Sequence, residues 1–110
     1  MSSSFEAARK MSAAMGIAFD EPAVRLVATM EGQLERLRLE RHGQFAVVLT
    51  ALEHHVEEGR GDPDVVRHLG DALLRLAALH PVPAATVREL TQTLGLLHSH
   101  VVDRAQAAGR

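Results

Sequence analysis

Residues 21–58 read EPAVRLVATMEGQLERLRLERHGQFAVVLTALEHHVEE, and this stretch decides how the chain folds. Its apolar residues recur at intervals of three and four, the period of a helix with one buried face. They are Val27, Met30, Leu34 and Leu37, followed by Phe45, Val48, Leu49, Leu52 and Val56. Gly43 interrupts the pattern, but no Ser, Thr, Asp or Asn directly follows it to begin a new helix. The pattern therefore favours one long helix over 21–58, with Gly43 as the place for a kink. The alternative is two shorter helices that meet at Gly43.

Signals for helix ends divide the rest of the chain. Ser3 and Glu6 fit a capping box, and an acidic residue followed closely by proline, at 20–22 and at 62–63, is typical of a helix start. We expect further helices over about residues 4–15, 62–80 and 84–107. Short connections place consecutive helices antiparallel. The sequence thus predicts an all-α, up-and-down bundle of one short and three longer helices, in a single domain over residues 1–110.

The length of the expected helix over 21–58 argues for a dimer. A helix of that length spans about 57 Å, whereas partners of about 20 residues cover only half of it. Part of its apolar face then needs a second chain, so we expect a homodimer. The predicted interface residues are Leu34, Leu37, Phe45, Leu94, Leu97 and Val101. For the last three, burial in the core of a monomer is an equally good interpretation.

Composition narrows the class of protein. The chain has 110 residues, 46% of them hydrophobic, no cysteine, and a formal net charge of −2. The charge argues against a general nucleic-acid binder, and the lack of cysteine excludes disulfides, thiolate zinc sites and thiol nucleophiles. No apolar run approaches the length of a membrane span, and residues 1–19 lack the apolar core of a signal peptide. We expect a cytoplasmic protein, and the preference for Arg over Lys and the many alanines favour a bacterial source.

The seven histidines are the most conspicuous candidates for chemistry. His54 and Glu58 share a helical face at a spacing of four, and His98 and Asp103 lie close together on the last helix, with His68 on the helix between. Imidazoles and carboxylates inside a helical bundle are ligands of iron and manganese, and zinc takes the same groups. An alternative prediction is therefore a metal site of iron, manganese or zinc held by His54, Glu58, His68, His98 and Asp103.

Two of these fragments resemble the hemerythrin pattern. His54-x3-Glu58 is similar to one of the metal-binding motifs of that family, and His98-x4-Asp103 is similar to another. The resemblance implies a metal-binding four-helix bundle. The chain departs from the family in lacking a His-x3-His element, since Ala72 stands four residues after His68, and no histidine precedes His42.

A structural interpretation of the histidines stands beside the metal site. His55 shares the helical phase of Leu52 and Val56, which predicts a half-buried imidazole with one hydrogen-bond partner. His80 precedes Pro81 at a helix end, where it can interact with the last carbonyl groups. His98 and His100 flank the apolar seam of the last helix and fit the rim of an interface.

No nucleophile elbow, phosphate-binding loop or dinucleotide fingerprint occurs in the sequence. We therefore favour a non-enzymatic function without a cofactor. The expected activity is that of an interaction or assembly protein, such as an adaptor, a regulator or a secretion-type chaperone. It would bind itself or a helix of another protein through an apolar helical surface, with no nucleic acid or membrane as partner.

Overall fold

The computed structural model describes residues 20–39, 42–57 and 61–108. Within these ranges the chain forms four helices and no strand: α2 (Glu21–Glu35), α3 (Gly43–Glu57), α4 (Pro63–Leu79) and α5 (Ala84–Ala108). The protein is thus an all-α helical bundle, as the sequence predicted. The short helix expected over residues 4–15 lies outside the described residues. None of the helices in the described ranges is both long and apolar enough to cross a membrane.

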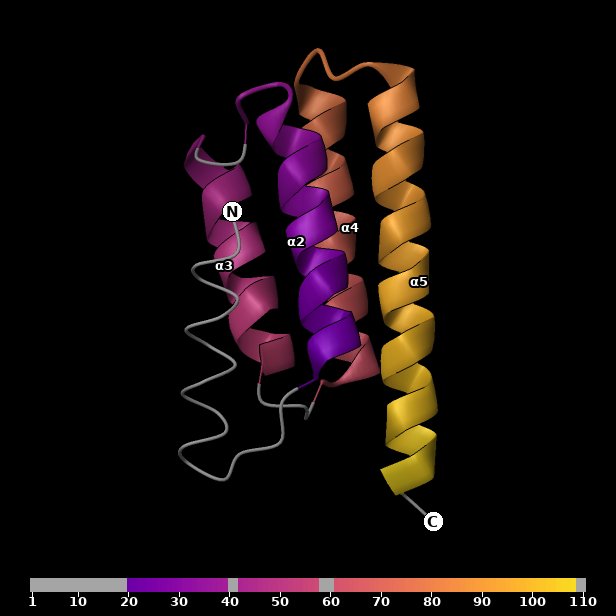
Figure 1. The fold of residues 1–110 in the computed structure, drawn as a ribbon. Coiled ribbons are helices and arrows are strands. Elements are labelled where there is room, and N and C mark those ends of the chain that lie inside the picture. The colour runs from indigo at the N-terminus through magenta and orange to yellow at the C-terminus, as the bar shows by residue number, and fades with distance from the viewer. Residues whose placement is uncertain (1–19, 40–41, 58–60, 109–110) are drawn as a thin grey trace.

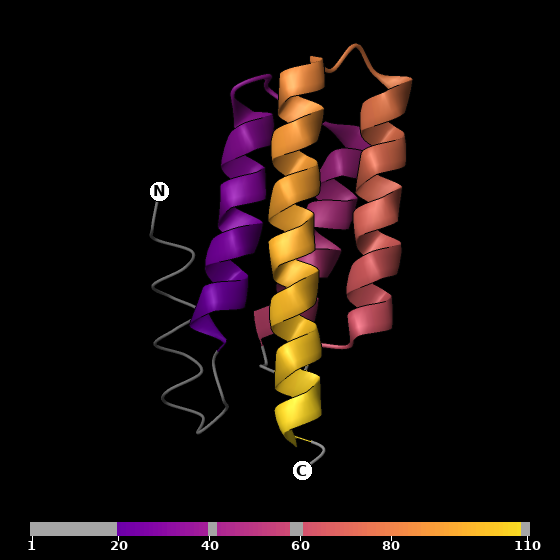
Figure 2. The same ribbon diagram turned by 90° about the vertical axis from the view of Figure 1, so that its right-hand side faces the viewer.

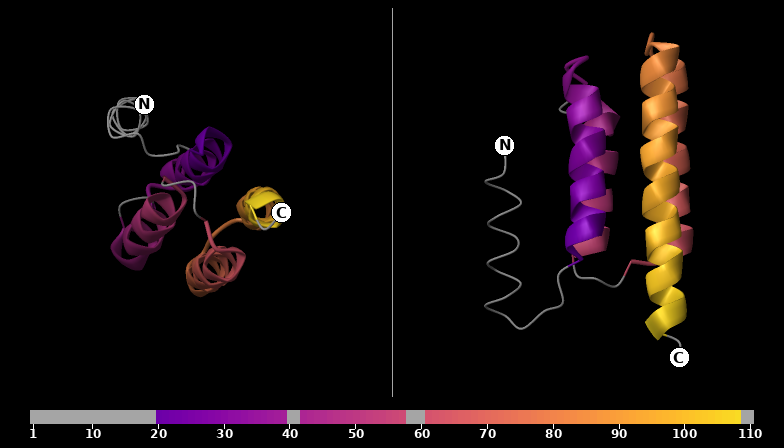
Figure 3. Two further views of the ribbon diagram at one scale, coloured as in Figure 1. Left: turned by 90° about the horizontal axis from the view of Figure 1, so that it is seen from below. Right: turned by 45° about the vertical axis from the view of Figure 1, so that its right-hand side comes forward.

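The four helices surround one core. Consecutive helices run in opposite directions, α2 and α4 upward and α3 and α5 downward in Figure 1. Each helix packs against two others, α2 and α4 each lying between α3 and α5. Viewed from the side of α5, α3 lies behind it, and the end-on view places one helix at each corner of the bundle (Figures 2 and 3).

The favoured continuous helix over 21–58 is wrong, because the chain reverses between α2 and α3. The Leu39 N–H donates to the Leu34 carbonyl at 3.0 Å, and the Arg38 N–H donates to the Glu35 carbonyl at 2.9 Å. This pair of hydrogen bonds defines a Schellman motif, which requires a left-handed residue. Arg38 supplies it with a φ of 58°, and Gly43 at the start of α3 adds a second positive φ of 45°. Since arginine stands where glycine is usual, the sequence carries no obvious stop signal there.

The reversal removes the premise of the dimer argument. Both α2 and α3 have 15 residues, close to the 17 residues of α4, so neighbouring helices cover them along their length. The chain's own core buries most of the residues predicted to form an interface: Leu34 (0% exposed), Phe45 (1%), Leu94 (8%), Leu97 (0%) and Val101 (1%). Leu37 alone is half-buried. For the five buried residues, the prediction of a partner-binding face is therefore corrected to the alternative interpretation, the core of a single chain.

The predicted helix starts are confirmed where the structure describes them. Asp20 caps α2, its carboxylate accepting a hydrogen bond from the Ala23 N–H at 3.3 Å, and Pro22 lies in the first turn. Asp62 caps α4 in the same way, accepting from the Asp64 N–H at 2.8 Å, with Pro63 at the first helical position. Short polar side chains at these points satisfy N–H groups that the helices leave without partners.

The left-handed residue at the end of α2 yields a stability prediction. An L-residue other than glycine is strained there, so Arg38→Gly should raise the free energy of unfolding by roughly 0.5–1 kcal/mol. Gly43→Ala should lower it by about 1 kcal/mol for the same reason. Urea unfolding followed by far-ultraviolet circular dichroism measures both, since the chain has neither Trp nor Tyr. A loss of stability in Arg38→Gly would contradict this account of the turn.

Candidate interaction groove

A groove follows the outer seam between α4 and α5. It consists of two adjoining hollows, of about 460 Å³ and about 210 Å³, which share the side chain of Leu74. The larger hollow lies toward the loop that joins the two helices. Its apolar lining comprises Leu74, Ala77, Ala78, Val82, Ala84 and Val87, with His80 and Arg88 at its edge. The smaller hollow is lined by Val66, Gly70, Leu74, Leu94 and Gly95, with Arg67, Asp71 and His98 beside them.

Small residues explain why the seam is hollow. Gly70 is buried, and a Cβ atom built there would lie 3.1 Å from Cδ2 of Leu94, so the leucine packs directly over the backbone of α4. Gly95, one residue further along α5, is exposed, and a Cβ atom there would meet nothing within 4 Å. Ala77 and Ala78, which are also small, line the groove further toward the loop. The result is an apolar channel where larger side chains would have filled the surface.

Charged side chains border the smaller hollow. Arg67 and Asp71 are both exposed on α4, one helical turn apart. Arg67 lies 3.6 Å from the carboxylate of Asp64, a neighbour on its own helix. Within the described part of the chain, Asp71 makes no ion pair, and neither does Arg88 at the edge of the larger hollow. The border therefore offers charges of both signs to solvent or to a partner.

The structure does not bring the predicted metal ligands together. His54 is exposed on α3 and lies 3.8 Å from Glu57, whereas His98 lies on α5, diagonally across the bundle. His68 and Asp103 are exposed, and the ring Nδ1 of His68 donates to the Asp64 carbonyl at 2.7 Å. Glu58 lies outside the described residues. Among the residues that are described, no group of three or more His, Asp or Glu side chains could hold a metal ion.

Two histidines, His55 and His80, make contacts that stabilise the fold. The Asp62 N–H donates to Nε2 of the half-buried His55 at 2.7 Å, which closes the connection between α3 and α4. Nδ1 of His80 donates to the Leu76 carbonyl at 2.8 Å in the last turn of α4, and its ring packs edge-on against Phe45. These contacts match the structural interpretation of His55 and His80 from the sequence.

A buried carboxylate fixes the start of α2 to α5. Asp20 is 3% exposed. Besides capping α2, it accepts a hydrogen bond from Nε2 of His100 at 2.7 Å, and its second oxygen lies 3.4 Å from Nε of Arg104. A buried carboxylate needs such partners because its desolvation is otherwise costly. His100 thus lies at a contact between helices, where the sequence suggested the rim of an interface between chains.

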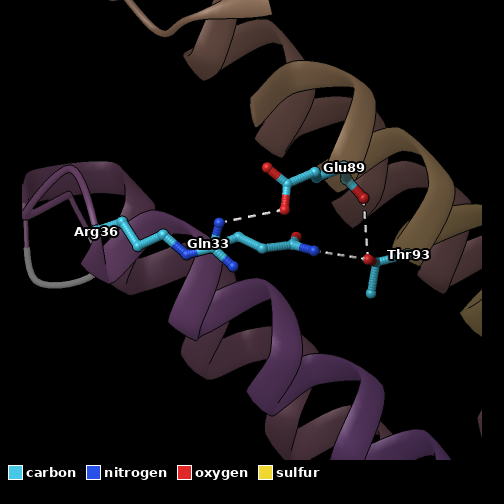
Figure 4. A network of polar contacts seen from close by, with 4 residues as sticks. All are labelled: Gln33, Arg36, Glu89 and Thr93. Carbon is cyan, nitrogen blue, oxygen red and sulfur yellow. Dashed lines mark hydrogen bonds and ion pairs between the residues drawn. The ribbon is translucent and has the colours of Figure 1, made fainter. Parts of the chain in front are cut away.

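A second polar network joins the other end of α2 to α5 (Figure 4). Nε2 of Gln33 donates to Oγ1 of Thr93 at 3.0 Å, and this hydroxyl donates to the Glu89 carbonyl at 2.9 Å. Arg36 lies 3.4 Å from the Glu89 carboxylate nearby. Both Gln33 and Thr93 are buried, and Oε1 of Gln33 is a buried atom without a hydrogen-bond partner among the described residues.

Two acidic side chains on α3 share a face at a spacing of four. Partial burial raises the pKa of Glu53 above its ordinary value, and a hydrogen bond to Glu57 and repulsion from its charge raise it further. The neighbouring His54 opposes this rise only in part. Ionised Glu53 therefore disfavours the folded state relative to its protonated form.

Over the residues that the structure describes, the fold and the groove define an all-α helical bundle with an apolar channel on one outer face. Comparison with known proteins gives no match: no family model fits the chain, and neither a curated protein nor a solved structure matches it. The resemblance to hemerythrin thus has no family match behind it.

Sequence reasoning missed the groove. Its residues come from two helices, and its shape depends on how these helices pack. The signal that could have indicated it is the placement of Gly70 and Gly95, two glycines in the middle of helices, together with the small residues Ala77 and Ala78 at the end of α4.

The buried amide of Gln33 gives a test of the network in Figure 4. Thr93→Val removes its hydrogen-bond partner and should lower the free energy of unfolding by about 1–3 kcal/mol, because the amide is then buried without any partner. Adding Gln33→Met should recover most of this loss, since no polar group is left unpaired. Unfolding in urea measures both.

Thr91→Val is the matched control for this experiment. Thr91 is an exposed threonine on the same helix whose hydroxyl donates to the Val87 carbonyl at 2.8 Å. Its substitution should change stability by less than about 0.5 kcal/mol. If Thr91→Val and Thr93→Val lowered the free energy of unfolding equally, the buried hydrogen bond to Gln33 would not stabilise the fold more than an exposed one.

The raised pKa of Glu53 predicts a pH-dependent gain for Glu53→Gln. A carboxyl group with a raised folded-state pKa favours folding while protonated, and this contribution is lost as pH rises through that pKa. At neutral pH the amide removes the repulsion between Glu53 and Glu57. The free energy of unfolding should therefore rise by about 0.2–0.5 kcal/mol, the usual cost of a like-charged pair at this spacing. The gain should shrink as the pH falls below the range in which glutamates ionise. Thermal unfolding across pH measures it, with the exposed Glu35→Gln as the charge-matched control.

Proposed function

We propose that this protein is a small non-enzymatic interaction or assembly protein, of the adaptor, regulator or chaperone kind, that binds a partner helix in the groove between α4 and α5. We infer a homodimer as its working state and the bacterial cytoplasm as its location, the latter from the composition of the sequence. The groove replaces the six-residue surface expected from the sequence, because most of those residues belong to the core.

The observation that carries this proposal is an apolar channel on the outside of a bundle whose described core residues are already buried by the chain itself. The side chains of the core, such as Phe45, Leu73 and Leu97, are almost fully buried by the chain itself. The channel nonetheless leaves Ala78 exposed and Leu74 and Val87 only half-buried. An amphipathic helix lying along two antiparallel helices can cover apolar positions of this kind.

The larger hollow suits a helix better than a small polar substrate. Its lining is aliphatic apart from His80 and Arg88 at the edge, and Nδ1 of His80 is already engaged by the Leu76 carbonyl. Such a surface gives contact area and little directional chemistry, which supports binding over catalysis.

Site-specific cross-linking tests the proposal. Because the chain has no cysteine, Ala78→Cys provides a single thiol in the groove for a benzophenone label. Ala28→Cys, an exposed alanine on α2, is the control. After irradiation in a cell extract, the label at position 78 should attach to one defined amphipathic helix, identified by sequencing of the cross-linked peptide. That helix belongs either to a second copy or to another protein. Equal, scattered labelling from both positions would overturn the proposal.

A further inference from the structure

Two features at the smaller hollow point outward from the chain: a glycine without an internal reason, and charges of which Asp71 makes no ion pair within the described residues while Arg67 has only an exposed contact with Asp64 at 3.6 Å. Gly95 is an exposed glycine in the middle of a 25-residue helix, where alanine is strongly preferred. Its φ is not positive and a Cβ atom would meet nothing within 4 Å, so neither backbone conformation nor internal packing requires glycine. A glycine on an outer helix surface does, however, permit another backbone to approach closely.

The second feature is the pair of opposite charges on α4. Arg67 and Asp71 lie four residues apart, which is about 6 Å along the helix axis. Both side chains are exposed beside the same hollow as Gly95. A two-fold axis that crosses α4 midway between them would bring each Arg67 to Asp71 of a second copy, giving two equivalent ion pairs.

The packing of α4 on α5 places these two features at one level of the bundle. Leu94 packs over Gly70, so Gly95 lies level with the segment of α4 between residues 67 and 71. A two-fold axis perpendicular to the helices at this level therefore also makes α5 cross its own copy at Gly95. The pairing of Arg67 with Asp71 of a second copy and the close approach of the two α5 helices at Gly95 thus require the same two-fold axis.

We propose that a second copy of this chain covers the groove with the same face of its own α4 and α5. In the resulting dimer α4 faces α4 and α5 faces α5, both antiparallel, with Arg67 paired to the partner copy's Asp71 and the two glycines at position 95 at the crossing. The proposal rests on the function proposed above and names its partner. The axis crosses the smaller hollow, so association covers the exposed apolar lining there.

Charge reversal distinguishes this arrangement from other ways of associating. Arg67→Asp and Asp71→Arg each replace two attractive contacts by two repulsive ones. Each should weaken the dimer about tenfold or more in sedimentation velocity. The double variant Arg67→Asp/Asp71→Arg restores opposite charges across the axis. Its dissociation constant should return to within about threefold of that of the original chain. Circular dichroism checks that every variant is folded.

Gly95→Leu provides a second, independent readout. The new side chain points into open space in the single chain, so helix content and thermal stability should be kept or improved, while the close crossing of α5 is blocked and the dimer is lost.

A chain that stays monomeric in sedimentation overturns the inference, as do single charge variants that associate as well as the double variant. If the chain is monomeric while the label at position 78 still attaches to a helix of another protein, the groove remains a binding site and only the identity of its partner is wrong. If the label attaches to no defined helix, the proposed function itself fails.

Discussion

The reversal between α2 and α3 is the constraint on which the rest of the structure depends. It places Arg38 in a left-handed conformation, which is unfavourable for any residue with a Cβ atom. In return, the Schellman hydrogen bonds satisfy the last carbonyl groups of α2, and Leu39 packs against the core beside the fully buried Leu34. Because the chain turns here, the two halves of one long apolar pattern face each other and close a core within a single chain.

Polar contacts at both ends of α2 set the position of α5. Asp20 joins His100 and Arg104 at the start of α2, and Gln33 joins Thr93 near its end. Hydrogen bonds have narrow distance and angle requirements, so two such contacts at a wide separation fix both the register and the rotation of α5. The opposite side of α5, with Gly95, is thereby directed toward the outer seam with α4, where the groove lies.

The histidines show which contacts can be predicted from a sequence pattern and which cannot. The phase of His55 and the position of His80 at a helix end predicted structural partners, and both have them. The metal-ligand prediction rested on spacing along single helices, which says nothing about whether two helices are neighbours. Because α3 and α5 lie diagonally across the bundle and His54 is exposed, the described members of that set do not meet. The groove escaped prediction for the same reason, since its hollows exist only between two helices.

By itself, the sequence determined the helical class, the starts of α2 and α4, and which side chains are apolar enough to form the core. These features follow from local rules: the helical period, the hydrogen bonds of Asp20 and Asp62, and the fixed φ of proline. Only the tertiary structure decided that residues 21–57 form two helices, that Leu34 and Leu97 are core residues of one chain, and that a channel remains beside Gly95. The physical reason is that the strain at Arg38 is offset by burial against helices far away in the sequence, a balance that no local pattern contains.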